Sequence, residues 1–324
     1  MSTKEVGSLF FPPSNWIAQM FEDHYPFAIW EERLRHLSQG GPLDVYLYLA
    51  AETLLSMVES YVTMLTGSFL NPGFRWMSVE HFAPPRKITK LVSLLHKSGG
   101  WKEIIEDEEF VSVKTVAESG LRPSDEQLFS MLLGNPASRS LSGEISTTYD
   151  PEWLIGLAQA AAIFRESHRS LLNAMKHGYR LPTYSDYSVD MLARGFAEDN
   201  QDLPYNPKEI REKLRSNSHV PAFWFLETDP EGKRKNEIMK GSKAELRLYA
   251  LDWNRALAHC RLTLELFKLL FDSTRRSSRL DEVRRRIESP LFGGILETPV
   301  RLFVPLQQPP GDAPYVVTAF VPKG

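Results

Sequence analysis

Residues 150–178 read DPEWLIGLAQAAAIFRESHRSLLNAMKHG, and this stretch decides the expected fold. It begins with a capping residue, Asp150, a proline at the first helical position and an early acid, which together mark a helix start. Apolar residues then recur every three or four positions, as in a helix with one buried face. The pattern predicts a single helix over residues 152–178. Its apolar line is Leu154, Leu157, Ala161, Phe164, His168, Leu171 and Met175.

Three other stretches show the same helical period, over residues 43–66, 86–97 and 244–274. The last of these is expected to be the longest helix, with Leu246 and Ala250 in its buried stripe. Long buried stripes need partner helices. The sequence therefore predicts a mainly α protein with a four-helix-bundle core. Two shorter helices are expected over 29–37 and 124–133.

Strand patterns occupy smaller parts of the chain. Residues 220–226 have the composition of a single strand, and residues 110–116 alternate like a second one. Residues 300–304 and 315–321 flank the turn sequence Pro309-Pro310-Gly311-Asp312, which predicts a C-terminal β-hairpin. Because two strands alone are marginally stable, the hairpin is expected to pack on the bundle or to pair with the strand near Phe223.

These patterns divide the chain into five consecutive segments. The segments are an N-terminal wrap (1–41), the first three bundle helices with their loops (42–181), an irregular insertion with a possible strand (182–242), the long helix with a basic extension (243–289) and the β-hairpin packed on the bundle (290–324).

Composition excludes several classes of protein. The 324 residues are 42% hydrophobic and carry a formal charge of −3, so binding to nucleic acid through bulk positive charge is excluded and any phosphate contact must be local. The single cysteine, Cys260, lies among apolar residues and is expected in the core, as in a reduced cytoplasmic protein. Charged residues interrupt every apolar run, so no membrane partner is expected. No nucleotide loop or metal-ligand cluster is present, and neither a cofactor nor a metal is expected.

Polar side chains line the end of the 152–178 helix. Arg169, Asn173 and His177 are spaced four apart and therefore share one face. Two interpretations fit this row. His177, with Lys176 before it and Gly178 after it, can simply end the helix, where cations interact well with the last carbonyl groups. The row can also be a binding or catalytic surface.

Residues 172–179, LNAMKHGY, resemble the short signature of the HEPN superfamily, whose helical bundles include RNA-cleaving toxins and defence proteins. Asn173, His177 and Tyr179 stand where the signature has a polar residue, a histidine and an aromatic residue. The resemblance implies that His177 is the acid/base, that Arg169 or Arg165 is the phosphate cation, and that Asn173 orients the histidine. It also implies a homodimer. The residues expected to contact RNA are Arg165, Lys176, Tyr179 and Arg180.

The arginine of the signature is replaced. Leu172 stands in its place in the tightest form of the pattern, and Arg169 precedes His177 by eight positions, a rise of about 12 Å on a helix. We therefore expect a non-catalytic or degenerate HEPN-like protein that binds RNA or a protein partner, in a stress or defence system. Two alternatives stay open: a metal-independent endoribonuclease that uses His177 and Arg169, and a structural or oligomerisation protein without a nucleic-acid role.

Three further polar residues are expected inside the bundle. His168 falls on the apolar line of its helix, while Glu52 and Glu59 are seven apart on one face of the 43–66 helix. We expect these carboxylates to pair with His168, Arg165 or Arg169, because buried charges require partners. A ferritin-like metal site is disfavoured, since the Glu-x-x-His motifs that it needs are absent.

Overall fold

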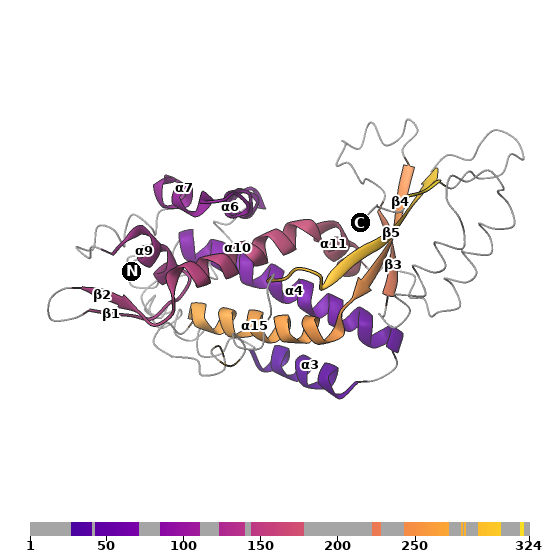
Figure 1. Cartoon of the computed structure of the whole chain (residues 1–324), viewed down its shortest axis with the longest axis horizontal. Helices are drawn as coiled ribbons and strands as arrows, with labels where there is room; N and C mark the ends of the chain where they lie inside the picture. The colour runs from indigo at the N-terminus through magenta and orange to yellow at the C-terminus, as the bar shows by residue number, and fades with distance from the viewer. Residues whose placement is uncertain are drawn as a thin grey trace, which may run out of the picture. The chain divides into compact units, whose positions relative to one another are not determined.

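The computed structural model describes residues 27–40, 43–70, 85–110, 123–139, 144–177, 222–227, 243–271, 280, 282, 291–305 and 318–320. Within these ranges the chain forms eight helices and six strands (Figure 1). The predicted mainly α fold is confirmed, whereas the four-helix HEPN-like arrangement stays a prediction. None of the described helices is both long and apolar enough to cross a lipid bilayer.

Most of the helices precede the four strands β3 to β6 in the chain order. The helices are α3 (Phe27–Gln39), α4 (Leu43–Leu70), α6 (Pro85–His96), α7 (Gly100–Glu106), α9 (Asp125–Leu132), α10 (Pro151–Ser167), α11 (Arg169–His177) and α15 (Trp253–Phe271). The strands are β1 (Ala137–Arg139), β2 (Ile145–Thr147), β3 (Ala222–Glu227), β4 (Lys243–Leu251), β5 (Leu296–Pro305) and β6 (Thr318–Phe320).

Four helices lie where the sequence predicts them. They are α3, α4, α6 and α9, expected over 29–37, 43–66, 86–97 and 124–133. Helix α9 begins at the capping residue Ser124, whose hydroxyl accepts a hydrogen bond from the Gln127 N–H while the Gln127 side chain accepts one from the Ser124 N–H. This reciprocal pair satisfies two donors that a helix start leaves open. Helix α7 and the β1–β2 hairpin were not predicted.

The chain divides into two compact units, each assembled from three segments. Unit 1 comprises Met1–Arg35, Ser56–Ser167 and Ala258–Phe292, and unit 2 comprises His36–Leu55, His168–Leu257 and Gly293–Gly324. The predicted division into five consecutive segments describes the chain differently and stays a prediction.

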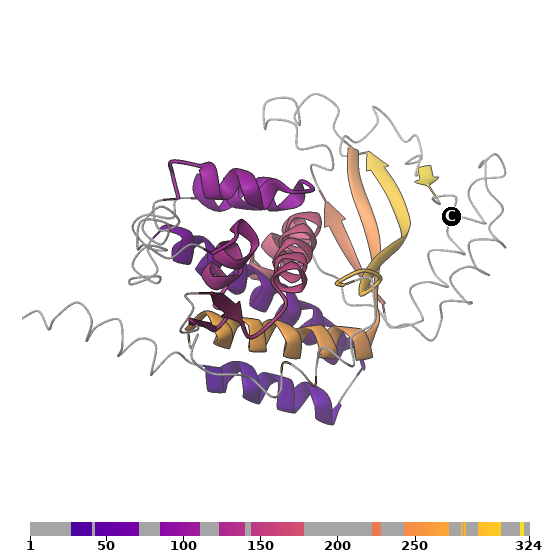
Figure 2. The ribbon, with the colours of Figure 1, turned by 60° about the vertical axis from the view of Figure 1, so that its left-hand side comes forward.

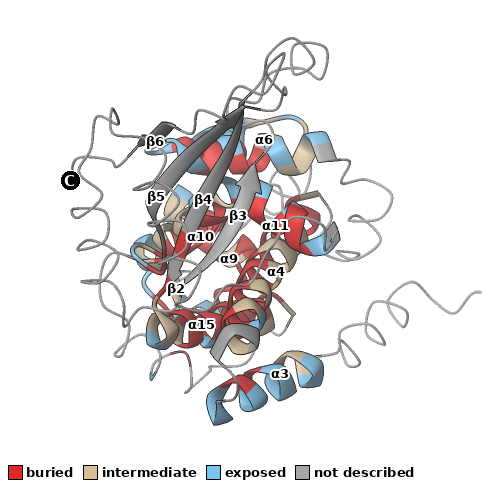
Figure 3. Ribbon diagram, turned by 90° about the vertical axis from the view of Figure 1, so that its right-hand side faces the viewer, coloured by how far each residue is buried: buried red, intermediate tan, exposed pale blue. Residues whose placement is uncertain are grey.

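Aromatic side chains form the core of unit 1. Phe69 of α4 contacts Phe110 and Phe129, with ring centroids 6.0 and 5.2 Å apart, and Trp101 of α7 contacts Phe129 at 5.7 Å. About two turns earlier on α4, Tyr61 contacts Phe267 of α15. These contacts join α4, α7, α9 and α15 around one apolar interior, with buried faces coloured red in Figure 3. Cys260 is fully buried there, as predicted.

Gly134 allows α9 to approach the backbone of α15 closely. Its φ is +88°, a left-handed conformation, and a Cβ built on it would lie 2.3 Å from the Leu269 carbonyl oxygen. Glycine is the one residue without this atom. The adjoining Asn135 side chain pairs with the backbone of Tyr149, accepting from its N–H at 3.0 Å and donating to its carbonyl at 2.8 Å. Together the two residues fix the connection that leads to α10.

Unit 2 contains a four-stranded antiparallel sheet in the order β3-β4-β5-β6. The three longer strands lie side by side in Figure 2. The strand expected over 220–226 is confirmed as β3, and the C-terminal hairpin is confirmed as β5 paired with β6. The hairpin does not pair with β3, however, because β4 lies between them.

The prediction of one helix over 244–274 is wrong in its first part. Residues Lys243–Leu251 form β4, and α15 begins only at Trp253. Strand β4 pairs on both sides, with β3 and with β5, so tertiary hydrogen bonds replace those of a helix. Asp252 then begins α15, since its carboxylate accepts a hydrogen bond from the Arg255 N–H at 3.0 Å. Among the described helices the longest is therefore α4, with 28 residues, whereas the described part of α15 has 19.

The prediction of one helix over 152–178 also requires correction. The helix is interrupted at His168, which separates α10 from α11. The first backbone hydrogen bond of α11 runs from the Leu172 N–H to the His168 carbonyl, at 2.9 Å. The His168 ring lies 6.2 Å from the ring of Tyr249, on β4. The strand expected over 110–116, the wrap before residue 27, the turn at 309–312 and most of the 182–242 insertion fall outside the described residues.

Candidate functional site

Helix α11 of unit 2 presents one polar face. Its exposed residues are Arg169, Ser170, Asn173 and Lys176. Its buried residues are Leu171, Leu172, Ala174 and Met175. The alternation is visible in Figure 3, where α11 carries both colours. Since Arg169, Asn173 and Lys176 are spaced four and three apart, they share the exposed face. The structure thus brings together three residues that the sequence selected.

The charge on this face comes from both ends of α11. Arg169 is its first residue and Lys176 lies in its last turn, about 10 Å further along the axis, and the helix contains no acidic residue. Tyr48 of α4 secures the far end, since its hydroxyl donates a hydrogen bond to the Met175 carbonyl at 3.3 Å. Burial and the nearby charge of Glu52 raise the pKa of Tyr48, so the phenol stays protonated as this donor requires.

Leu172, at the position where the signature that these residues resemble has an arginine, is buried. Its side chain is 2% exposed, within the apolar side of α11. The position at which the signature has an arginine therefore faces the interior of unit 2. A cation at this position would not lie on the exposed face with Asn173 and Lys176.

Arg165 is buried, unlike Arg169 and Lys176. It lies near the end of α10 in unit 1, and its side chain is 7% exposed. The guanidinium donates two hydrogen bonds to the Glu59 carboxylate of α4, one of them at 3.2 Å, and a third to Glu166 at 3.2 Å. This bidentate ion pair engages the planar donor face of the arginine. Arg165 therefore differs from Arg169 and Lys176, whose side chains are exposed.

The three polar residues expected inside the bundle are placed in different surroundings. Glu59 contacts Arg165, one of the partners that the sequence suggested for it. His168 belongs to unit 2, is half-buried and lies against the ring of Tyr249. Glu52 lies close enough to Tyr48 for its charge to act on the phenol. The imidazole side chain of His177, and all of Tyr179 and Arg180, fall outside the described residues.

Two polar features were not selected from the sequence. His259, in the apolar stretch of α15, is buried, and its Nε2 accepts a hydrogen bond from the Phe292 N–H at 3.1 Å. Phe292 has a φ of +57°, an unusual value for a residue with a side chain, and this hydrogen bond supports it. The second feature is a row of ion pairs between α6 and the residues that follow it, for which the acidic run at 106–109 was the available signal.

Comparison with protein-family models, with curated proteins and with solved structures gave no match to this chain. The relation to the HEPN superfamily therefore rests on residues 172–179 and on the helical pattern alone.

Proposed function

We propose that this chain is a non-catalytic HEPN-like protein that binds RNA through the exposed face of α11. The observation that carries the proposal is the position of Arg169, Asn173 and Lys176 on one exposed helix face. Arginine and lysine side chains are the usual contacts to phosphate oxygens, and an amide side chain donates to the same oxygens. A local patch of this kind is compatible with the formal charge of −3, since it needs no basic surface elsewhere.

The same helix argues for binding rather than cleavage. Metal-free RNA cleavage needs a proton-transferring group and a cation at one phosphate. Leu172 is buried, Arg165 is held by Glu59, and Arg169 is eight positions from His177, a rise of about 12 Å. None of these arginine positions supplies the cation beside His177 within one chain. Homodimerisation, which the resemblance implies, belongs to the same proposal and is measured by light scattering on the purified protein.

Fluorescence anisotropy with a labelled 20-nucleotide RNA, without divalent metal, tests the proposal. We expect the double substitution Arg169→Ala/Lys176→Ala to weaken binding and to flatten the dependence of log K on log salt by about 1.4, which is 0.7 for each lost phosphate contact to single-stranded RNA. Asn173→Ala should weaken binding with the salt slope unchanged, because an amide carries no charge.

The matched control removes two positive charges elsewhere. Arg33→Ala/Lys102→Ala changes two exposed cations that stack on Trp30 and Trp101. If this control weakens binding as much as the α11 variant, net charge and not the α11 face is responsible, and the proposal fails. The integrity of the RNA is followed on a gel in the same samples. Cleavage by the original protein that is lost in His177→Ala would replace this proposal with the endoribonuclease alternative.

A further inference from the structure

Helix α6 of unit 1 has one apolar and one basic face. Its sequence, PRKITKLVSLLH, contains no acidic residue. The buried residues of α6 are Leu91, Val92, Leu94 and Leu95. Arg86 and Lys90 are four residues apart and share one side of α6, and Lys97 is the first residue after its end. We call Arg86, Lys90 and Lys97 the α6 cation row.

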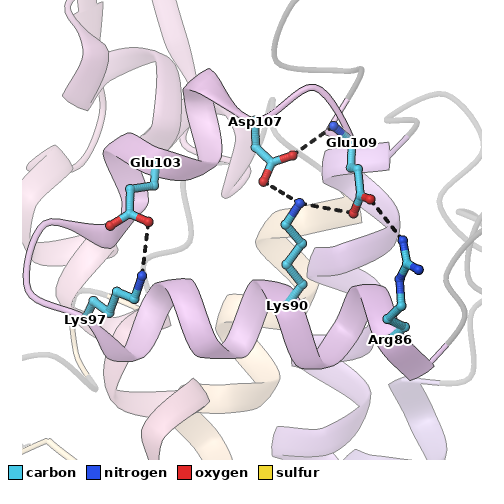
Figure 4. Close-up of polar contacts among 6 residues, drawn as sticks. All are labelled: Arg86, Lys90, Lys97, Glu103, Asp107 and Glu109. Carbon is cyan, nitrogen blue, oxygen red and sulfur yellow. Dashed lines mark hydrogen bonds and ion pairs between the residues drawn. The ribbon is translucent and has the colours of Figure 1, made fainter.

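Every cation of this row contacts a carboxylate from one short acidic segment (Figure 4). The Lys97 ammonium lies 3.2 Å from Glu103, and the Arg86 guanidinium lies 3.1 Å from Glu109. Lys90 lies between two acids, 2.6 Å from Asp107 and 3.1 Å from Glu109. We call residues 103–109 the acidic segment, since five of its seven residues, EIIEDEE, are acidic.

The acidic segment is held in place by apolar side chains on either side of its carboxylates. Ile104 and Phe110 are fully buried, and the Phe110 ring contacts Phe69. The Asp107 carboxylate also accepts a hydrogen bond from the Glu109 N–H at 2.9 Å, which fixes the turn. Arg86 and the Lys97–Glu103 pair are exposed, and Lys90, Asp107 and Glu109 are half-buried. Ion pairs that water reaches in this way contribute little to folding stability. The apolar anchors therefore position the carboxylates, and the main effect of the ion pairs is to neutralise the cation row.

Carboxylate and phosphate groups are recognised by the same donors of arginine and lysine. The acidic segment thus occupies the positions at which phosphates would contact the row. We propose that the α6 cation row is a second binding surface for the RNA phosphate backbone, and that the acidic segment inhibits it within the chain. Removal of the carboxylate charges makes the three cations of the row available to a ligand. While the carboxylate charges are present they repel a phosphate chain, because like charges brought together are unfavourable.

RNA binding by a charge-neutralised variant tests this inference. Asp107→Asn/Glu109→Gln keeps the size of both side chains and an oxygen that can accept from the Glu109 N–H, but removes the charges that face Arg86 and Lys90. The variant is made together with Arg169→Ala/Lys176→Ala, so the α11 face makes no contribution. We expect about tenfold tighter binding of the 20-nucleotide RNA at low salt, since a like-charge contact is relieved. We also expect a salt slope steeper by about 1.4, from two new phosphate contacts.

Two control variants test whether the gain depends on the position of the removed charges and on the cations Arg86 and Lys90. Asp125→Asn/Glu126→Gln, in the first turn of α9, removes the same charge at a distance from the row, and it should leave binding unchanged. Arg86→Ala/Lys90→Ala in the neutralised variant should return binding to its starting level. Equal gains in both acid-to-amide variants, or no gain in either, would overturn the inference.

A third variant covers the case in which Asp107→Asn/Glu109→Gln lowers the melting temperature. Glu103→Gln releases Lys97 alone, at an exposed site, and should steepen the salt slope by about 0.7. An unchanged slope in Glu103→Gln contradicts the inference. The choice of RNA as the ligand rests on the proposed function. The measured gain does not depend on the α11 face, because Arg169 and Lys176 are absent from these proteins.

Discussion

Arg165 and Arg169 are four residues apart, but the fold gives them different environments. Arg165 lies in the last turn of α10 in unit 1, where the carboxylate of Glu59 binds it through two hydrogen bonds. Arg169 begins α11 in unit 2 and is exposed. The helix break at His168 separates the two. The comparison teaches that spacing along a helix does not decide the role of a cation, because a carboxylate from a distant element can engage it.

The largest expected effect comes from placing an arginine at position 172, where the signature that residues 172–179 resemble has one. Leu172→Arg places a charge at a position that is 2% exposed. We expect the free energy of unfolding to fall by roughly 4 kcal/mol, since a buried unpaired charge is among the most destabilising changes. Urea denaturation followed by circular dichroism measures it. A variant as stable as the original, with new RNA-cleaving activity, would show that position 172 reaches the surface.

Removing the partner of Arg165 should have the next largest effect. Glu59→Ala leaves a nearly buried guanidinium without its bidentate acceptor, and we expect a loss of about 3 kcal/mol in the free energy of unfolding. The double variant Glu59→Ala/Arg165→Met should recover most of this loss, because no buried charge remains. A double variant less stable than Glu59→Ala would mean that Arg165 has another important partner.

Tyr48→Phe tests how α11 is held at its far end. The substitution removes the hydrogen bond to the Met175 carbonyl, and we expect a loss of about 1 kcal/mol in the free energy of unfolding. RNA affinity should fall with it if the position of Lys176 depends on this contact. Tyr46→Phe, two residues earlier on α4, is the matched control.

Arg169→Ala completes the comparison with Arg165. Because Arg169 is exposed, its removal should change the free energy of unfolding by less than about 0.5 kcal/mol. The measurement is the same urea titration. A loss as large as that of Glu59→Ala would show that Arg169 is structural, and would remove it from the proposed RNA surface.

The smallest effect concerns pH and the α6 cation row. Lys90 lowers the pKa of Glu109 and the two acids raise the pKa of Lys90. Glu109 therefore stabilises the fold above its ordinary pKa, and this contribution is lost as the pH falls through the lowered value. The contribution of Lys90 is present below its ordinary pKa and is lost as the pH rises through the raised one. The melting temperatures of the original protein and Glu109→Gln should differ slightly at neutral pH and converge in strong acid.

Much of the helical structure was predictable because local signals agree with the tertiary environment. Ser124 with Gln127 marks the start of α9, and Asp150 with Pro151 marks that of α10. The apolar pattern of residues 243–251 resembles a continuation of α15, and for this reason the sequence predicts a helix there. The local signal for the true start of α15 is Asp252.

Only part of the candidate site was predictable from the sequence. Periodicity placed Arg169, Asn173 and His177 on one face. The structure exposes Arg169 and Asn173, together with Lys176, while the side chain of His177 lies outside the described residues. Periodicity did not reveal that Arg165 is bound by Glu59, 106 residues away in the sequence. The acidic run at 106–109 was visible in the sequence, but its pairing with the cations of α6 was not, since this pairing depends on how the chain turns after α7.

The sequence by itself determined the mainly α character, most helix boundaries and the polar face of α11, because hydrophobic period and capping residues act within a few positions along the chain. Only the tertiary structure decided that β4 is a strand, that the helix breaks at His168 and which cations are paired. Strand β4 depends on hydrogen bonds from β3 and β5, and the pairing of Arg165 depends on Glu59, all of them distant in the sequence, so no local pattern encodes either.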